Sequence, residues 1–316
     1  MIISLTLNPS LDYVLQVNSL ALEETQRAEN AFLYASGKGI NVSRMLTRFG
    51  VQTSAWGFVG GLNGDRFSRI LEEEGINTSF IPCQAETRLN VIITELKTYD
   101  QLRVSAKGPE ISDKEIIKLY ERINNLPEEL EFVTFGGSIP KNVPKNIYKE
   151  LIEIIKSKGI RCILDTSNEA LTQGIQAKPF LIKPNLHELN EILEGEIIST
   201  IEEIKIAASK IVSEGVKNVA ISLAKEGAIF VNESKIIHAF APKVEVKSKV
   251  GAGDSMVAGL IYGLHRNLPE EDIIKYGIAF GTAAVLTIGT ELAYKEDIEQ
   301  ILPEIEIKSV ENNNYI

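Results

Sequence analysis

The sequence contains few cysteines, few histidines and no block of basic residues. Cys83 and Cys162 are its only cysteines, which fits a reducing cytoplasm better than a disulfide framework, and we expect both to be buried thiols. The histidines His187, His238 and His265 have no spacing typical of a metal site or a nucleophile triad. We therefore interpret them as structural or surface residues.

Long apolar runs are also absent. The net charge of −10 argues against non-specific binding to nucleic acid. The N-terminus has no basic leader and turns polar at Asn8, so it is interpreted as a first strand and not as a signal peptide. The most apolar stretch, residues 276–290, is too short to span a membrane and predicts a buried helix. We expect no nucleic-acid partner and no membrane partner.

Two common nucleotide-binding motifs are missing as well. The Walker phosphate loop, Gly-x4-Gly-Lys-Ser/Thr, does not occur. Each of two glycine clusters lacks the third glycine of Gly-x-Gly-x-x-Gly, since Val42 and Met256 take its place. A phosphorylated ligand would therefore have to bind in a locally positive pocket that is built from neither of these motifs.

Helical and strand-like stretches alternate through most of the chain. Such alternation predicts an α/β fold in which a mostly parallel sheet is covered by helices on both faces. The β-prone pieces near 11–35 and 88–106 fall outside it and predict a small separate sheet over the strand ends, where ligands of such folds bind. Strands are predicted at 2–7, 13–17, 54–59, 88–96, 102–105, 132–135, 160–165, 180–183 and 218–223, with a hairpin at 227–240. Helices are predicted at 37–49, from a turn at 60–64 through Glu74, and at 113–125, 144–157, 186–194, 201–213, 254–266 and 270–287. A polar connection is predicted up to Ser36 and a frayed tail at 310–316.

A glycine turn that runs into a helix, at residues 250–267, is the strongest signal of chemistry. Gly251 and Gly253 allow a tight turn, and the first amides of the helix have no intrahelical partner, so they can bind an anion. Asp254 lies where these donors converge, and the helix dipole favours its ionised form by roughly 0.3–1 kcal/mol. A carboxylate beside an anion hole suits the base of a phosphoryl transfer. The alternative is a plain glycine turn in which Asp254 is only an N-terminal helix residue.

A second glycine turn opens the helix at 37–49. Its Lys38 faces the unfavourable end of the helix dipole, a penalty that a bound anion would reverse. Arg88 and Asn90 lie two residues apart on a strand and face the same side, and the planar fork of arginine suits a phosphate. Taken alone, each cation is better explained as a solvated surface residue. Asp12 either accepts hydrogen bonds from sugar hydroxyls or makes a turn.

The stretch Lys183-Pro184-Asn185 ends a predicted strand, and Glu188 follows at the start of a helix. A carboxylate and an amide so placed can orient metal-bound water beside phosphates. The same spacing is that of a capping box, with Asn185 as the cap and Glu188 as the third helical residue. The two interpretations are compatible.

Five stretches, in this order, resemble the ribokinase-like, PfkB-type family of sugar kinases. They are Asn-Pro-Ser-Leu-Asp at 8–12, Gly-Lys-Gly-Ile-Asn-Val at 37–42, Gly-Gly-Ser-Ile-Pro at 136–140, Lys-Pro-Asn-x-x-Glu at 183–188 and Val-Gly-Ala-Gly-Asp-Ser at 250–255. The resemblance implies a single kinase domain over 1–316, a ribokinase-like three-layer sandwich with a small β-sheet lid. The lid, inserted at about 11–35 and 88–106, would close over the sugar and pair two subunits into a homodimer.

The resemblance also implies a role for the motif residues. The catalytic group would be the base Asp254 with the anion hole of Gly251, Ala252 and Gly253. The phosphosugar would be bound by Asp12, Gly39 and Asn41 at its hydroxyls and by Lys38, Arg88 and Ser138 at its phosphate, with Asn90 beside Arg88. ATP would be bound by Lys183, Asn185, Ser222, Ala224, Gly227, Val250, Gly251 and Gly253, and Mg²⁺ by Asn185 and Glu188 through water. Ser36, Ala224 and Lys249 stand where glycine, glycine and threonine are frequent in the family.

Within the family, residues 37–42 and 87–91 look most like the 1-phosphofructokinase branch, with tagatose-6-phosphate kinases as close relatives. This implies ATP-dependent transfer to O6 of fructose 1-phosphate, giving fructose 1,6-bisphosphate, with transfer to O1 of tagatose 6-phosphate as the alternative. A ribokinase or nucleoside kinase is disfavoured, because an uncharged sugar gives Lys38 and Arg88 no anion to meet. A non-catalytic sugar-phosphate sensor on the same scaffold is disfavoured by the whole glycine turn around Asp254.

Overall fold

Two sheets of unequal size organise the chain in the computed structural model, which describes residues 1–21, 25–193, 197–288 and 291–312. The larger sheet has ten strands in the order β14-β13-β12-β11-β10-β9-β8-β1-β4-β5. Strands β11 to β5 of that order are parallel, and β12, β13 and β14 are antiparallel, which confirms the mostly parallel sheet. The bounds are β1 (Ile2–Thr6), β4 (Thr53–Val59), β5 (Asn77–Pro82), β8 (Phe132–Gly136), β9 (Arg161–Asp165), β10 (Leu181–Ile182), β11 (Asn218–Ser222), β12 (Ala228–Asn232), β13 (Lys235–Ala239) and β14 (Ile307–Glu311).

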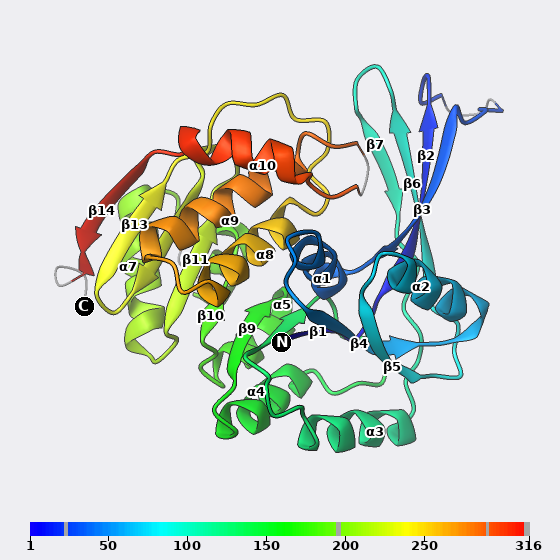
Figure 1. The fold of residues 1–316 in the computed structure, drawn as a ribbon, viewed down its shortest axis with the longest axis horizontal. Coiled ribbons are helices and arrows are strands. Elements are labelled where there is room, and N and C mark those ends of the chain that lie inside the picture. The colour runs from blue at the N-terminus through cyan, green and yellow to red at the C-terminus, as the bar shows by residue number, and fades with distance from the viewer. Residues whose placement is uncertain (22–24, 194–196, 289–290, 313–316) are drawn as a thin grey trace.

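Helices cover both faces of this sheet, as predicted (Figure 1). Successive side chains of a strand point to opposite faces, and in β1 Ile3 belongs to one buried cluster while Ile2 belongs to the other. The cluster around Ile3 includes side chains of α3 (Asp113–Asn124), α4 (Ile147–Ser157), α5 (Asn168–Ile175), α6 (Leu186–Ile192) and α7 (Ile201–Ser213). The cluster around Ile2 includes side chains of α1 (Lys38–Arg48), α8 (Ala252–His265), α9 (Glu270–Ala284) and α10 (Lys295–Ile301), and α2 (Gly61–Glu73) packs beside α1 through Phe67 and Ile40.

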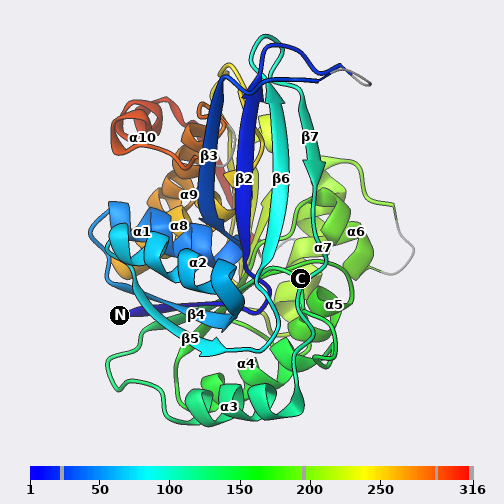
Figure 2. The same cartoon turned by 90° about the vertical axis from the view of Figure 1, so that its right-hand side faces the viewer.

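The smaller sheet stands on one edge of the core (Figure 2). Its strand order is β3-β2-β6-β7, with β2 (Ser10–Val17), β3 (Asn30–Ser36), β6 (Arg88–Glu95) and β7 (Gln101–Val104). Because β1 runs into β2 through residues 7–9 and α1 follows β3 directly, this sheet rises from the carboxyl ends of the parallel strands. The expected second sheet is therefore present. Residues 22–24 of the expected segment 11–35 lie outside the described residues.

Several local predictions were wrong. The expected polar connection up to Ser36 contains β3, whose strand character depends on pairing with β2. The expected turn at 60–64 is already helix from Gly61, because the carboxylate of Glu86 accepts the Asn63 amide at 2.6 Å and acts as a distant cap. Both edge strands were missed because their sequences lack an apolar pattern: β5 is mostly half-buried and β14 is largely exposed. The short helices α5 and α10 were missed as well. The expected frayed tail begins inside β14, and its residues 313–316 lie outside the described part of the chain. Residue 194 of the helix predicted at 186–194 also lies outside the described residues.

The expectations for the cysteines and the histidines agree with the structure. Cys83 and Cys162 are free and buried. His265 Nδ1 contacts Glu131 Oε2 at 2.6 Å, His238 packs on a phenylalanine ring, and His187 is exposed. Among the described residues no cluster of His, Cys, Asp and Glu is arranged to hold a metal ion. None of the described helices is long and apolar enough to cross a membrane.

Candidate active site

The start of α8 presents backbone amides without intrahelical partners at the carboxyl ends of the strands. Gly251 caps the helix with φ 77°, a left-handed conformation that glycine adopts without strain. The first helical hydrogen bond runs from the Ser255 amide to the Gly251 carbonyl at 2.8 Å. The amides that precede Ser255 therefore have no intrahelical acceptor. The helix begins at Ala252, two residues earlier than predicted, so Asp254 lies in its first turn.

Asp254 is buried beside these amides. The Nδ2 of Asn41 donates to its Oδ2 at 2.7 Å. Burial raises the pKa of Asp254 to about 6, although the charges of Lys38 and Lys183 and the hydrogen bond from Asn41 lower it. From the helix dipole alone we expected the pKa of Asp254 to be lowered. That expectation was wrong because burial, which the sequence does not show, has the larger effect. At neutral pH the carboxylate is still mainly ionised, as a base requires.

The ammonium of Lys38 lies among carboxylates. Its Nζ is 2.9 Å from Asp165 Oδ1 and 4.0 Å from Glu188 Oε1. Burial alone would lower the pKa of Lys38, but the charges of Asp165, Asp254 and Glu188 outweigh it and hold the pKa above its ordinary value. A Cβ on Gly39 would lie 2.6 Å from Thr6 Oγ1, so a glycine is needed for this turn of α1 to approach β1.

Asp165, at the end of β9, is a site residue that the sequence reasoning missed. Its side chain is buried, and its Oδ1 also lies 3.4 Å from Lys183 Nζ. Burial alone would raise the pKa of Asp165, but Lys183 and Lys38 hold it below the usual range. The available signal was its position, because a carboxylate at the carboxyl end of a parallel strand faces the ligand side of the sheet.

The capping box of α6 is confirmed. The Asn185 amide donates to Glu188 Oε2, and the Glu188 amide donates to Asn185 Oδ1, each at 2.9 Å. These oxygens are therefore occupied, whereas Oδ2 of the buried Asp165 has no hydrogen-bond partner. Mg²⁺ prefers oxygen ligands and keeps several waters, so this donor set fits an ion held through water with phosphate oxygens completing its shell.

The residues expected around ATP converge from three segments. Ser222, at the end of β11, bridges to Asn185, and its amide donates to the Pro184 carbonyl at 3.0 Å. The following turn places Ala224 at φ 52° and Gly227 at φ 86°. Val250 precedes the anion hole, and its amide donates to Ser248 Oγ at 3.2 Å. Asn185 is thus joined to the Ser222 turn, and Lys183 lies near the start of α8, where a Cβ built on Gly253 would be 3.5 Å from Lys183 Nζ.

The lid carries a second polar group. Asp12 and Asn90 are paired in register on β2 and β6, and Asn90 Nδ2 donates to Asp12 Oδ1 at 2.8 Å. Arg88 donates to the Asn8 carbonyl at 2.9 Å, and Asn8 Nδ2 donates to the Ser138 hydroxyl at 3.0 Å. Arg88 from β6 and Ser138 from the loop after β8 are therefore brought together around Asn8.

A second arginine on the lid was missed by the sequence reasoning. Arg103 of β7 is paired with Ile92, on the face of the sheet that carries Arg88 and Asn90. Burial lowers the pKa of Arg103 and the charge of Asp12 raises it, so this guanidinium lies within electrostatic range of Asp12. Nothing in the sequence around residue 103 distinguishes it from a surface cation.

Unpartnered buried polar atoms gather at this site. Within the described residues, six buried side-chain oxygens or nitrogens have no hydrogen-bond partner. Five belong to the site or its immediate neighbours: Thr6 Oγ1, Asn8 Oδ1, Asn41 Oδ1, Asp165 Oδ2 and Ser255 Oγ. Leaving such groups unpaired is costly, so their concentration marks a place that receives polar ligands or water.

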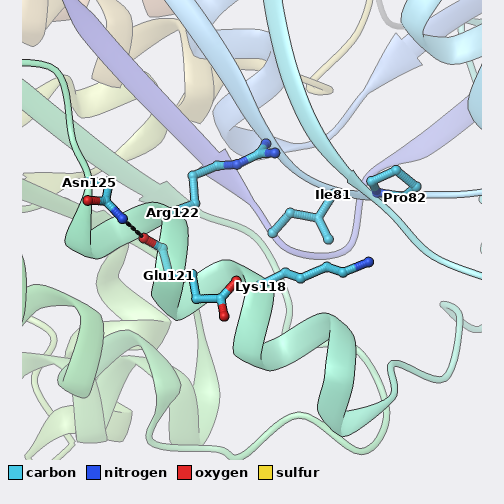
Figure 3. A pocket seen from close by; sticks show the side chains of 6 residues that line it. All are labelled: Ile81, Pro82, Lys118, Glu121, Arg122 and Asn125. Carbon is cyan, nitrogen blue, oxygen red and sulfur yellow. Dashed lines mark hydrogen bonds between the residues drawn. The ribbon is translucent and has the colours of Figure 1, made fainter.

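A surface hollow elsewhere on the molecule contains none of these residues. It lies between α3 and the end of β5 and is lined by Ile81, Pro82, Lys118, Glu121, Arg122 and Asn125 (Figure 3). Arg122 Nη1 donates to Ser79 Oγ at 3.0 Å, so this guanidinium is already engaged with the edge strand. None of its six lining residues is a buried acid or base.

Comparison with known proteins identifies relatives over nearly the whole chain. Residues 5–297 match the family described as pfkB family carbohydrate kinase. The chain is 38% identical to the 1-phosphofructokinase of Bacillus subtilis, over 97% of this chain and 99% of that one. It is 32% identical to a tagatose-6-phosphate kinase of Staphylococcus epidermidis, over 98% and 100%. The crystal structure of phosphofructokinase-2 from Escherichia coli with substrates and products superposes with a TM-score of 0.91 at 30% identity, covering 96% of this chain and 98% of that one.

Proposed function

The chain belongs to the pfkB family of carbohydrate kinases and is a phosphotransferase with a sugar-phosphate acceptor, and from this premise we propose that it transfers the γ-phosphoryl group of ATP to O6 of fructose 1-phosphate. The product is fructose 1,6-bisphosphate. The observation that carries the proposal is Asp254, a buried carboxylate with a pKa of about 6 beside the free amides of α8. The alternative acceptor is tagatose 6-phosphate at O1, supported by the full-length likeness to a tagatose-6-phosphate kinase.

In this proposal, Asp254 accepts the proton of the sugar hydroxyl while the hydroxyl oxygen bonds to the γ-phosphorus. The bond between that phosphorus and the bridging oxygen breaks, and ADP leaves with the electron pair. The backbone of Gly251, Ala252 and Gly253 donates to the phosphoryl oxygens, where charge builds up during transfer. Asn41 holds the carboxylate in place through its 2.7 Å hydrogen bond.

Substrate residues divide between the core and the lid. Asp12, Gly39 and Asn41 bind sugar hydroxyls, and Asn90 orients Asp12. Arg88 and Ser138, which meet around Asn8, bind the phosphate that the sugar already carries. An arginine suits this role because its fork donates two parallel hydrogen bonds to a phosphate. ATP is bound by Lys183, Asn185, Ser222, Ala224, Gly227, Val250, Gly251 and Gly253.

Mg²⁺ is the expected metal, held by Asn185 and Glu188 through water. When bound, the ion would neutralise negative charge on the phosphates of ATP. The protein contributes the orientation of that water shell, because the capping box fixes the Asn185 and Glu188 side chains on α6. Lys183 adds a positive charge on the same side of the site.

The lid is also proposed to pair two subunits of a single-domain kinase into a homodimer. On β2 the residues that alternate with Asp12 are apolar, and Tyr13 is exposed. On the neighbouring strands Leu89, Leu102 and Val104 are exposed on the same face, opposite to Asp12 and Asn90. A second lid would cover this apolar face. The two buried free cysteines suit the cytoplasm as the compartment.

An ADP-release assay tests the function. Purified protein is incubated with ATP and Mg²⁺ and with fructose 1-phosphate, tagatose 6-phosphate, fructose 6-phosphate or ribose, and kcat/KM is compared. A lead of about a hundredfold for fructose 1-phosphate, or about 2.7 kcal/mol of transition-state discrimination, supports the proposal. A lead for tagatose 6-phosphate supports the alternative. In the preferred reaction Asp254→Asn should lower kcat by about 10²–10⁴; a loss of only a few-fold with an intact fold would contradict the base assignment.

A further inference from the structure

The ammonium of Lys38 lies at the base of the site and not on the lid. Gly136 is paired in register with Asp165 across β8 and β9, and a Cβ on Gly136 would lie 2.9 Å from the Cβ of Lys38. The first turn of α1 thus sits on the end of β8, and the Lys38 side chain extends beside Asp165. An ammonium has three donors, and the hydrogen bond to Asp165 uses one of them.

One oxygen of Asp165 connects Lys38 to the anion hole. Lys183 Nζ lies 3.4 Å from the same Oδ1, and a Cβ built on Gly253 would lie 3.5 Å from Lys183 Nζ. One turn after Lys38 on α1, Asn41 donates to Asp254. Two lysines and the free amides of α8 therefore surround one small volume next to the base. Positive groups placed there meet the charge that develops on a transferring phosphoryl group.

The cation of the lid belongs to a different group of charges. Arg88 donates to backbone carbonyls at the root of the lid, and the charge that acts on its guanidinium is that of Asp12. The charges that act on Lys38 are those of Asp165, Asp254 and Glu188. Among the described residues, the charges that act on Lys38 thus differ from the one that acts on Arg88, although the family resemblance implied that both cations bind the same phosphate.

We propose that Lys38 contacts the phosphoryl group in transfer, not the phosphate that the sugar already carries, and that Asp165 positions its ammonium for this contact. The proposal rests on the kinase function proposed above. During transfer the sugar oxygen bonds to the γ-phosphorus, the bond to the bridging oxygen of ADP breaks, and the proton passes to Asp254. Lys38 stays protonated throughout and donates to the phosphoryl oxygens. Asp165 is then a positioning residue, and Lys38 is a catalytic one.

The division of effects between kcat and KM tests this inference. The kinetic constants of Lys38→Ala and Arg88→Ala are measured with the phosphosugar that the wild-type protein turns over best. The comparison therefore does not depend on which sugar that is. Lys38→Ala should lower kcat by about 10²–10³ while KM for the phosphosugar changes by less than about threefold. Arg88→Ala should raise that KM at least tenfold with a smaller effect on kcat. Calorimetric titration of phosphosugar without ATP should show near wild-type affinity for Lys38→Ala.

Asp165→Asn provides the second arm. Asp165→Asn should lower kcat and leave KM for the phosphosugar unchanged. When it is added to Lys38→Ala, the further loss of kcat should be much smaller than the loss that Asp165→Asn causes alone, because both substitutions remove the same interaction. If Lys38→Ala does not fold, the isosteric Lys38→Met takes its place. A tenfold rise in the KM of Lys38→Ala for the phosphosugar at intact kcat would overturn the inference. A purely structural effect would overturn it too: the fraction of folded Lys38→Ala protein would fall, but kcat per folded molecule would not. The wild-type acceptor panel tests the proposed function separately.

Discussion

Replacing Asp254 by asparagine should stabilise the fold while removing the base. Burial raises the pKa of this carboxyl from 3.8 to about 6. Because the folded state then binds the proton more tightly than the unfolded chain, stability falls as pH rises from 3.8 to 6, and the full cost is present above pH 6. A shift of about 2 units corresponds to about 3 kcal/mol. Asparagine is uncharged and avoids this cost, and it can still accept the hydrogen bond from Asn41.

Thermal unfolding followed across pH measures the effect. For a chain of 316 residues the unfolding entropy makes 1 kcal/mol equal to roughly 1.5 °C, so Asp254→Asn should raise Tm by about 4 °C at pH 7.5. The gain should shrink below pH 6 and vanish at about pH 3, below the unfolded value of 3.8, where the wild-type carboxyl is protonated in both the folded and the unfolded state. Scanning calorimetry of wild type and variant at several pH values gives both numbers.

Asp165→Asn is the matched control, since it removes a buried carboxylate from the same site whose pKa is shifted in the opposite direction. Lys183 and Lys38 outweigh burial and hold the pKa of Asp165 below its usual value. Its ionised form therefore contributes stability above the unfolded pKa, and this contribution is lost as pH falls through the folded pKa. Asp165→Asn should lower Tm at neutral pH. A lower Tm for Asp254→Asn at pH 7.5, or a gain that does not change with pH, would refute the reasoning.

Three further outcomes are expected. Since Asp254 must be ionised, kcat/KM should fall about tenfold per unit below pH 6, and a flat profile down to pH 5 would contradict its role as base. Ala224→Gly should raise the free energy of unfolding by up to about 1 kcal/mol, and with it the urea midpoint, because Ala224 has φ 52° where glycine is unstrained; a lower midpoint would show that the strain is not relieved. Glu188→Gln should keep the capping box and Tm but raise the Mg²⁺ concentration needed for half-maximal rate several-fold, whereas Glu203→Gln, in the capping box of α7, should leave it unchanged.

The sequence by itself determined the features that depend on near neighbours. The alternation of apolar patterns predicted the mostly parallel sheet with helices on both faces, and the glycine turn predicted a helix start with free amides beside Asp254. The spacing of Asn185 and Glu188 predicted the capping box, because its partners are only three residues apart. The segments that broke the alternation predicted the lid sheet. Each of these follows from interactions within one or two turns of the chain or from the period of one element.

The tertiary structure decided what lies beside each functional group. Asn41 and Asp254 are 213 residues apart, and only the packing of α1 against α8 brings amide and carboxylate together. The pKa of Asp254 follows from desolvation, which depends on everything that covers it, so the helix dipole alone gave the wrong direction. The position of Asp165 at the end of β9 could be read from the sequence, but its contacts with Lys38 of α1 and Lys183 after β10 depend on the fold. Strand β3 likewise needs its partner β2, because a strand satisfies its backbone through residues distant in the chain.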